Sequence, residues 1–103
     1  MSGANVIVLY PRAEGSTFDK EYYLKNHMPL AMKHWQKHGF KSYAVTELNA
    51  DSPYSYSVVM EFESYESFGA ASQDPATKEV MDDVVNFSSE KPVLIHGGVI
   101  GRG

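Results

Sequence analysis

The sequence predicts an α+β fold of ferredoxin-like βαββαβ layout, in which a four-stranded antiparallel sheet carries its helices on one face. Stretches of strand composition and stretches of helical spacing follow one another in the order strand, helix, strand, strand, helix, strand. The first and last strands are apolar on both faces, although two helical regions can cover only one face of such a sheet. Residues 1–103 contain no Pro-, Gly- or Ser-rich linker, so they are expected to form one domain.

The first strand and the first helix have recognisable ends in the sequence. A β-branched apolar run over residues 6–10 ends at Pro11, which cannot donate to a sheet hydrogen bond, and this run is expected to be a strand. Either Thr17 or Asp19 can cap the next element, a helix, and Gly39 supplies its stop.

The interior of this helix carries two apolar stripes and a proline. One stripe holds Leu24, Met28, Ala31 and Trp35, and the adjoining stripe holds Tyr23, His27, Leu30 and His34. Pro29 removes one backbone hydrogen bond, so a kink, or two helices end to end, is expected near His27.

The remaining elements are indicated by turn and cap signals. Residues 41–48 and 54–62 are expected to form a hairpin, because the stretch between them has the composition of a turn. A second helix is expected over residues 64–72, and the Asp-Pro step at 74–75 restarts it. Residues 92–100 close the chain as the fourth strand.

Composition argues against several classes of partner. The net charge is −4 and the basic residues are scattered, so nucleic acid is not an expected partner. No apolar stretch approaches the length of about 18 residues that spans a membrane, and no signal peptide is evident, so a soluble cytoplasmic protein is expected. The apolar sheet face that the helices leave uncovered favours a second copy of the chain, and a homodimer is expected.

The segment from Phe18 to Leu30 resembles the opening of the first helix in the EthD family, named for a protein of ethyl tert-butyl ether degradation. That helix typically opens with a phenylalanine, an aromatic pair and a His-x-Pro-Leu step, here Phe18, Tyr22 with Tyr23, and His27 to Leu30. The βαββαβ order and the length extend the likeness over nearly the whole chain. The resemblance implies a dimeric α+β barrel, an arrangement shared with small monooxygenases, muconolactone-type isomerases, polyketide cyclases and haem-degrading enzymes.

For function, the resemblance implies a cofactor-free enzyme of degradation or secondary metabolism, oxidoreductase-like or isomerase- and cyclase-like. Its pocket would lie between sheet and helices and take a small hydrophobic oxygenated metabolite. His27 is the candidate acid/base, because an imidazole titrates near neutrality. Tyr23 lies one turn earlier on the same stripe, where its phenol could share a substrate oxygen or orient the imidazole. Tyr22 points about 100° away and is assigned to packing or to the surface.

Further pocket residues and cofactors can be assessed from the same patterns. The other residues expected to line the pocket are His34, Leu30, Tyr56, His96 and Trp35. His34 and His38 stand four residues apart without a third ligand, so no metal site is expected. No glycine-rich dinucleotide or phosphate loop is present, so no flavin or nicotinamide cofactor is expected.

Three functions stay open at this point. The chain could be an enzyme with His27 as its acid/base, or a non-catalytic binding protein for a hydrophobic ligand. It could also be a purely structural dimer module, which would lack any cavity of about 300 Å³ or more.

Overall fold

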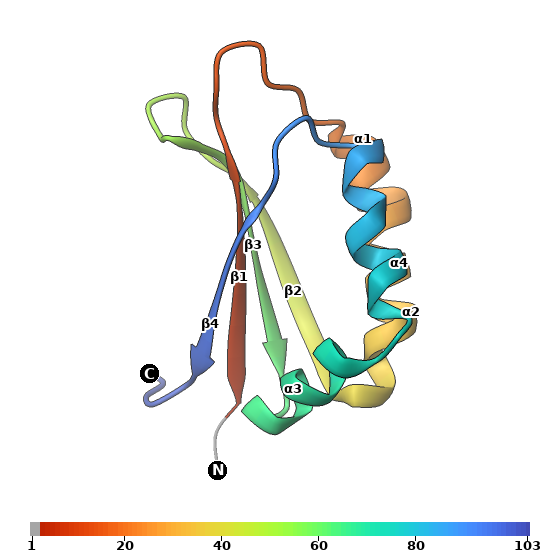
Figure 1. The fold of residues 1–103 in the computed structure, drawn as a ribbon. Helices are drawn as coiled ribbons and strands as arrows, with labels where there is room; N and C mark the ends of the chain where they lie inside the picture. The colour runs from red at the N-terminus through yellow and green to blue at the C-terminus, as the bar shows by residue number, and fades with distance from the viewer. Residues whose placement is uncertain (1–2) are drawn as a thin grey trace.

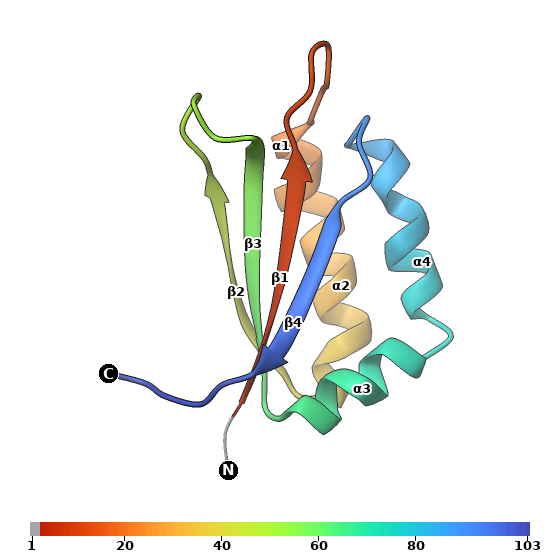
Figure 2. The same cartoon turned by 60° about the vertical axis from the view of Figure 1, so that its left-hand side comes forward.

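The computed structural model describes residues 3–103 and shows two layers, a four-stranded antiparallel sheet and a layer of helices on one of its faces (Figure 1). The strands are β1 (Ala4–Pro11), β2 (Phe40–Glu47), β3 (Tyr54–Phe62) and β4 (Val93–Gly98). They lie in the order β2-β3-β1-β4 across the sheet (Figure 2). The predicted βαββαβ order and the ferredoxin-like fold class are therefore confirmed.

Two helical segments form the second layer. The first runs without interruption through α1 (Lys20–Tyr22), a π-helical turn η1 (Tyr23–His27), α2 (Met28–Trp35) and a 3₁₀ turn η2 (Gln36–His38). The second consists of α3 (Tyr65–Gln73), then α4 (Thr77–Asp82) and a 3₁₀ turn η3 (Asp83–Asn86). Asp19 is the cap of the first segment, because its carboxylate accepts from the backbone N–H of Tyr22 at 3.0 Å. Gly39 ends that segment with φ 85°, a left-handed conformation that glycine adopts without strain.

The break expected near His27, as a kink or as two helices end to end, takes the form of a widened turn between α1 and α2. The backbone N–H of Met28 donates to the carbonyl of Tyr23, five residues back, so this turn holds one residue more than an α-helical turn. The helix thereby continues past a proline that has no N–H to donate.

The extra residue changes which side chains the helix buries. Tyr23 and His27, the first and last residues of the wide turn, are buried, and after it the buried face passes to Met28 and Ala31. Each predicted stripe is therefore buried over only part of its length, and Leu24 is 49% exposed. One added residue rotates the helix by about 100°, which is the angle between the two predicted stripes.

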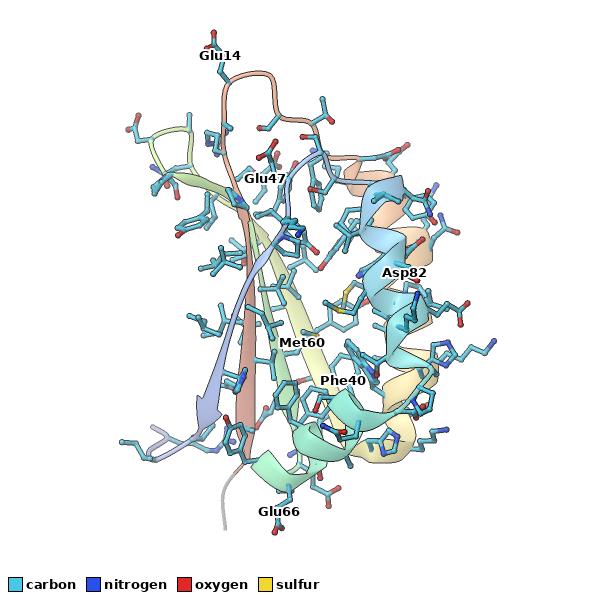
Figure 3. The ribbon with its side chains drawn as sticks, viewed as in Figure 1. Glu14, Phe40, Glu47, Met60, Glu66 and Asp82 are labelled. Carbon is cyan, nitrogen blue, oxygen red and sulfur yellow. The ribbon has the colours of Figure 1, made fainter. Side chains whose placement is uncertain are left out.

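The core lies between the two layers. Alternate residues of the central strands face the helices and are buried, namely Ala4, Val6, Val8 and Tyr10 of β1 and Val58, Met60 and Phe62 of β3. Figure 3 shows Met60 and Phe40 projecting into this space, while other side chains of the sheet project to the bare side. These buried strand residues therefore form the sheet side of any site that lies between the sheet and the helices.

The helix-free face of the sheet is apolar at its centre. Ile7 pairs with Val59 on one side and with Ile95 on the other, and Val59 in turn pairs with Ala44, so an apolar row crosses all four strands. Val59 and Ile95 are 39% and 48% exposed. A row of this kind, open to water, matches the uncovered face that the sequence predicts.

Candidate functional site

The imidazole of His27 lies in the wall of a cavity of about 80 Å³ between the sheet and the helices. Its lining comes from β1, β3, both helical segments and the start of β4, and includes Val8, Tyr23, Met28 and Val84; we refer to it as the His27 cavity. His27 is 6% exposed and is the only buried polar residue in the described part of the chain. Burying an imidazole is costly unless it is hydrogen-bonded, so its partner determines what it can do.

That partner is the carboxylate of Asp83. Nδ1 of His27 lies 3.0 Å from Oδ2 of Asp83, and the carboxylate also accepts from the Tyr22 hydroxyl at 2.6 Å and from the Asn86 amide at 2.9 Å. Because a carboxylate only accepts, the proton of the neutral imidazole resides on Nδ1. Every fully buried side-chain nitrogen and oxygen in residues 3–103 has a partner, so Nε2 of His27, which has none, keeps some accessible surface, and His27 lines the cavity.

The electrostatics keep this pair as a neutral imidazole beside an anion. Burial lowers the pKa of His27 below its ordinary 6.5, and the hydrogen bond and charge of Asp83 only partly oppose that effect. Burial raises the pKa of Asp83, but the bonds from Tyr22, Asn86 and His27 together outweigh it, so that carboxyl titrates below its usual range. At neutral pH the unprotonated Nε2 of His27 is therefore ready to accept a proton.

Aromatic rings hold the imidazole in place. The ring of Tyr23 stacks on it with centroids 5.0 Å apart, and Phe87 lies 4.5 Å away at a tilt. Burial raises the pKa of Tyr10 to about 12, partly offset by a hydrogen bond with Tyr23, and burial likewise raises the pKa of Tyr23. Both phenols therefore stay protonated and act as packing and hydrogen-bonding groups, not as bases.

A second apolar cavity adjoins the first. It measures about 260 Å³, and Ala71 and Phe68 of α3 are in its wall; we refer to it as the Ala71 cavity. The two cavities share four lining residues, Trp35, Met60, Met81 and Leu94. The combined volume of the two cavities reaches the lower limit of pockets that bind small molecules, about 300 Å³.

Three of the predicted site residues meet at these cavities. His27 and Tyr23 line the His27 cavity, and Trp35 lines both cavities while its indole N–H donates to the Thr77 hydroxyl at 2.8 Å. The structure thus brings together, from one helical segment, the imidazole, the phenol and the indole that the sequence singled out.

The other predicted lining residues lie elsewhere. His34 faces α4, where its Nε2 contacts Glu79 at 2.8 Å, and Leu30 is likewise outside both cavities, because the wide turn rotates their stripe away from the sheet. Tyr56 stacks on Phe18 at 4.1 Å. His96 is exposed and lies 2.6 Å from the Tyr65 hydroxyl, and it lines neither cavity.

Asp83 was not predicted from the sequence, nor was the hydrogen bond that Tyr22 makes to it. Asp83 stands three residues after Val80 and four before Phe87, so a lone carboxylate within an apolar stripe was the available signal. Tyr22 was assigned to packing or to the surface, and it does pack against the core. Its hydroxyl in addition donates to Asp83, because the second helical segment packs directly beside the first.

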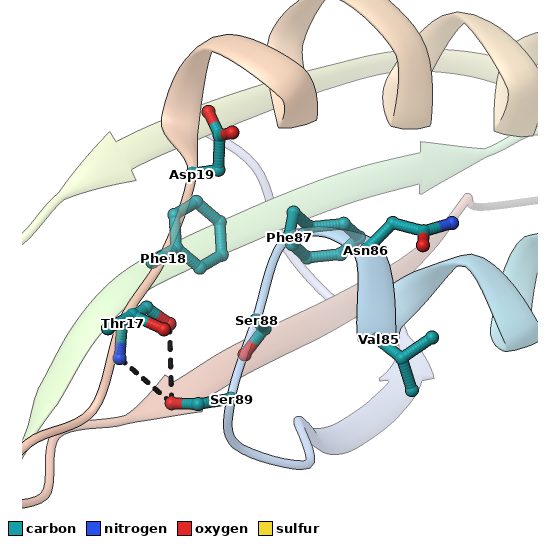
Figure 4. Close-up of a pocket in the computed structure, with 8 residues that line it drawn as sticks. All are labelled: Thr17, Phe18, Asp19, Val85, Asn86, Phe87, Ser88 and Ser89. Atoms are coloured by element: carbon teal, nitrogen blue, oxygen red, sulfur yellow. Dashed lines mark hydrogen bonds between the residues drawn. The ribbon is translucent and has the colours of Figure 1, made fainter.

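Another hollow lies at the end of the helices, between Thr17 and Ser89 (Figure 4). It is wide and open to solvent, and its chain segments are joined by the bond from the Thr17 N–H to the Ser89 hydroxyl at 2.8 Å. Its one carboxylate, Asp19, already caps a helix. It therefore offers no enclosed space, and its carboxylate is already engaged.

Within residues 3–103 there is no cluster of three or more His, Asp or Glu side chains that could hold a metal ion. His38, considered with His34 for such a site, instead contacts Asp74 at 2.8 Å. Among the helices that the structure describes, none is long and apolar enough to cross a membrane.

Comparison with known proteins places the chain in a family. A family model described as the EthD domain matches residues 15–91. The chain is similar to the crystal structure of an EthD-like protein from Ralstonia eutropha JMP134, with 27% identity and a TM-score of 0.82 over 99% of this chain and 96% of that one. A comparison with curated proteins gives no match.

Two more distant structures share the fold. SnoaB, a cofactor-independent oxygenase from Streptomyces nogalater, is 13% identical with a TM-score of 0.63, over 100% of this chain and 96% of its own. A dimeric ferredoxin-like protein of unknown function from Jannaschia sp. CCS1 is 14% identical with a TM-score of 0.63, over 96% of this chain and 100% of its own.

Proposed function

Because the chain belongs to the EthD family, we propose that it is an enzyme acting on a small, largely apolar, oxygenated molecule bound between its sheet and helices. The observation that carries this proposal is the buried pair of His27 and Asp83, in which Nε2 of His27 has no hydrogen-bond partner and His27 lines an apolar cavity. A fold hosts many functions, so the proposal depends on this site and not on the architecture.

The proposed role of His27 is proton transfer. Nε2 takes a proton from an activated C–H or phenolic O–H of the substrate, while Asp83 stabilises the imidazolium that forms, at 3.0 Å from Nδ1. The proton then returns to the product, which leaves the imidazole neutral for the next turnover. Asp83 is a positioning residue in this scheme, and the stacked Tyr23 ring fixes the plane of the imidazole.

The apolar cavity suits such chemistry without a metal or an organic cofactor. A proton-abstracting group surrounded by apolar walls works in a low-dielectric space, where a developing charge interacts strongly with nearby dipoles. Isomerisation, cyclisation, or oxygenation in which dioxygen is the oxidant all begin with this step. SnoaB, a cofactor-independent oxygenase of the same fold, supports the last of these by analogy only.

We further propose that two copies pair through their helix-free sheet faces. The apolar row through Ile7, Val59 and Ile95 supports this, since a single chain leaves it in water. The dimeric ferredoxin-like protein from Jannaschia sp. CCS1 gives a precedent for pairing of this fold. Light scattering of the purified chain should give twice the mass of one chain, and Val59→Lys should give the mass of one.

The catalytic proposal can be tested before the natural substrate is known. β-Tetralone, alkylphenols and hydroquinones serve as probes, with exchange of carbon-bound hydrogen for solvent deuterium followed by NMR and oxygen uptake followed at an electrode. With any probe that turns over, His27→Ala should lower the rate by about 10²-fold or more.

The matched control is His34→Ala, which removes an imidazole from the same helical segment but outside both cavities. It should leave the rate unchanged. If His27→Ala turns over probes as fast as the unaltered chain, His27 has no part in the chemistry.

A binding protein without catalysis is the second candidate, and the Ala71 cavity favours it because no ionisable side chain is in its lining. In that case the probes should raise the melting temperature without forming product. Ligand binding that survives His27→Ala, with no turnover in either protein, would support this candidate.

A further inference from the structure

The Ala71 cavity has apolar walls and polar groups that are already engaged. The hydroxyl of Thr77 accepts from the Trp35 indole at 2.8 Å and donates to the Ala71 carbonyl at 2.6 Å. The hydroxyl of Ser72 donates to the Gly69 carbonyl at 2.8 Å. A polar acceptor of a ligand placed here would lose its water without gaining a donor, whereas an alkyl or aryl group would gain contacts.

The two cavities therefore differ in chemistry although they adjoin. The His27 cavity includes an imidazole whose Nε2 has no hydrogen-bond partner, while the lining of the Ala71 cavity contains no ionisable side chain. Met81 and Leu94 line both cavities and are 51% and 45% exposed, so they lie where the joined space meets solvent. A molecule entering between them reaches an acceptor on one side and an apolar space on the other.

We propose that the substrate is an amphiphile, with an oxygenated head at Nε2 of His27 and an apolar tail in the Ala71 cavity. This rests on the proposed function for the identity of the head site. The tail site is inferred from the second cavity and from the engagement of its polar groups. The depth of the Ala71 cavity then sets how long a tail the protein accepts.

The test uses binding of para-alkylphenols, from para-cresol to para-hexylphenol. Trp35 is the single tryptophan of the chain and lines both cavities, so quenching of its fluorescence reports occupancy directly. Each methylene added to the tail should tighten binding about fourfold until the cavity is full. Affinity that does not depend on tail length would overturn the proposal.

Two alanines provide a matched pair of variants. Ala71 and Ala31 are each 1% exposed, and each lines only one of the cavities. Ala71→Leu should weaken para-hexylphenol about tenfold or more and para-cresol by less than about twofold, because it fills the tail space. Ala31→Leu should weaken both probes alike. Equal effects of Ala71→Leu on the two probes would contradict the assignment of the tail site.

Overpacking can prevent folding, so a variant that enlarges the site is included. Phe68→Ala widens the Ala71 cavity and should move the preferred tail length upward in the same series. An unchanged preference contradicts the proposal. If turnover does not respond to His27→Ala but binding still depends on tail length, the catalytic role is overturned and the tail site stands. If turnover falls in His27→Ala but binding does not depend on tail length, only the tail site is overturned.

Discussion

Replacing Phe87 by alanine should remove a large part of the stability of the protein. Phe87 is 4% exposed and ends the second helical segment, where its ring meets Tyr23 at 4.8 Å, His27 at 4.5 Å and Tyr10 at 5.7 Å between centroids. A buried Phe→Ala change costs about 4 kcal/mol, through lost apolar transfer and the cavity left behind. The total free energy of unfolding of a chain of this length is about 5–15 kcal/mol.

Urea unfolding followed by Trp35 fluorescence measures this loss. With a denaturant slope of about 2 kcal/mol per molar, the midpoint should fall by about 2 M. Val85→Ala is the control two positions earlier, since Val85 is 81% exposed and its truncation should change the stability by less than about 0.5 kcal/mol. A loss below about 1 kcal/mol for Phe87→Ala, at an unchanged slope, would refute the claim that these rings form one packed unit.

Two further predictions concern titration. Asp83→Asn removes the charge that raises the pKa of His27, so an NMR titration of the imidazole should show that pKa lower than in the unaltered chain. An unchanged pKa would mean that Asp83 does not face the ring. Hydrogen bonds to His38 and to the Ala76 N–H lower the pKa of Asp74 to about 2. The ionised carboxylate therefore contributes folding stability that is complete above pH 3.8 and is lost as the pH falls through about 2. Asp74→Asn should flatten that part of the acid unfolding curve measured by circular dichroism, and an identical curve would contradict the assignment.

The fold could be predicted from the sequence because its signals are local. The strand expected over residues 54–62 coincides with β3, since apolar alternation and the preceding turn fix both its face and its start. The helix stop at Gly39 could be predicted from the conformational preference of glycine. The uncovered sheet face could be predicted by counting the apolar faces of the strands.

The site was only partly predictable, for two physical reasons. The residues on both sides of the break expected near His27 were placed with one helical period, and the single residue absorbed by the wide turn displaced Leu30 and His34 from the cavities. Asp83 reaches His27 only because two helical segments far apart in sequence pack side by side, and no local pattern contains that information.

The wide turn also makes the number of residues between Tyr22 and Trp35 a fixed quantity. Each helical residue rotates the part of the helix before it by about 100° relative to the part after it. Deleting one residue here, Asn26 for example, would restore a regular helix but would swing either Tyr22 away from Asp83 or Trp35 out of the two cavities. A shorter relative could keep its helix only by supplying the carboxylate's partner, or the indole wall, from another position in the chain.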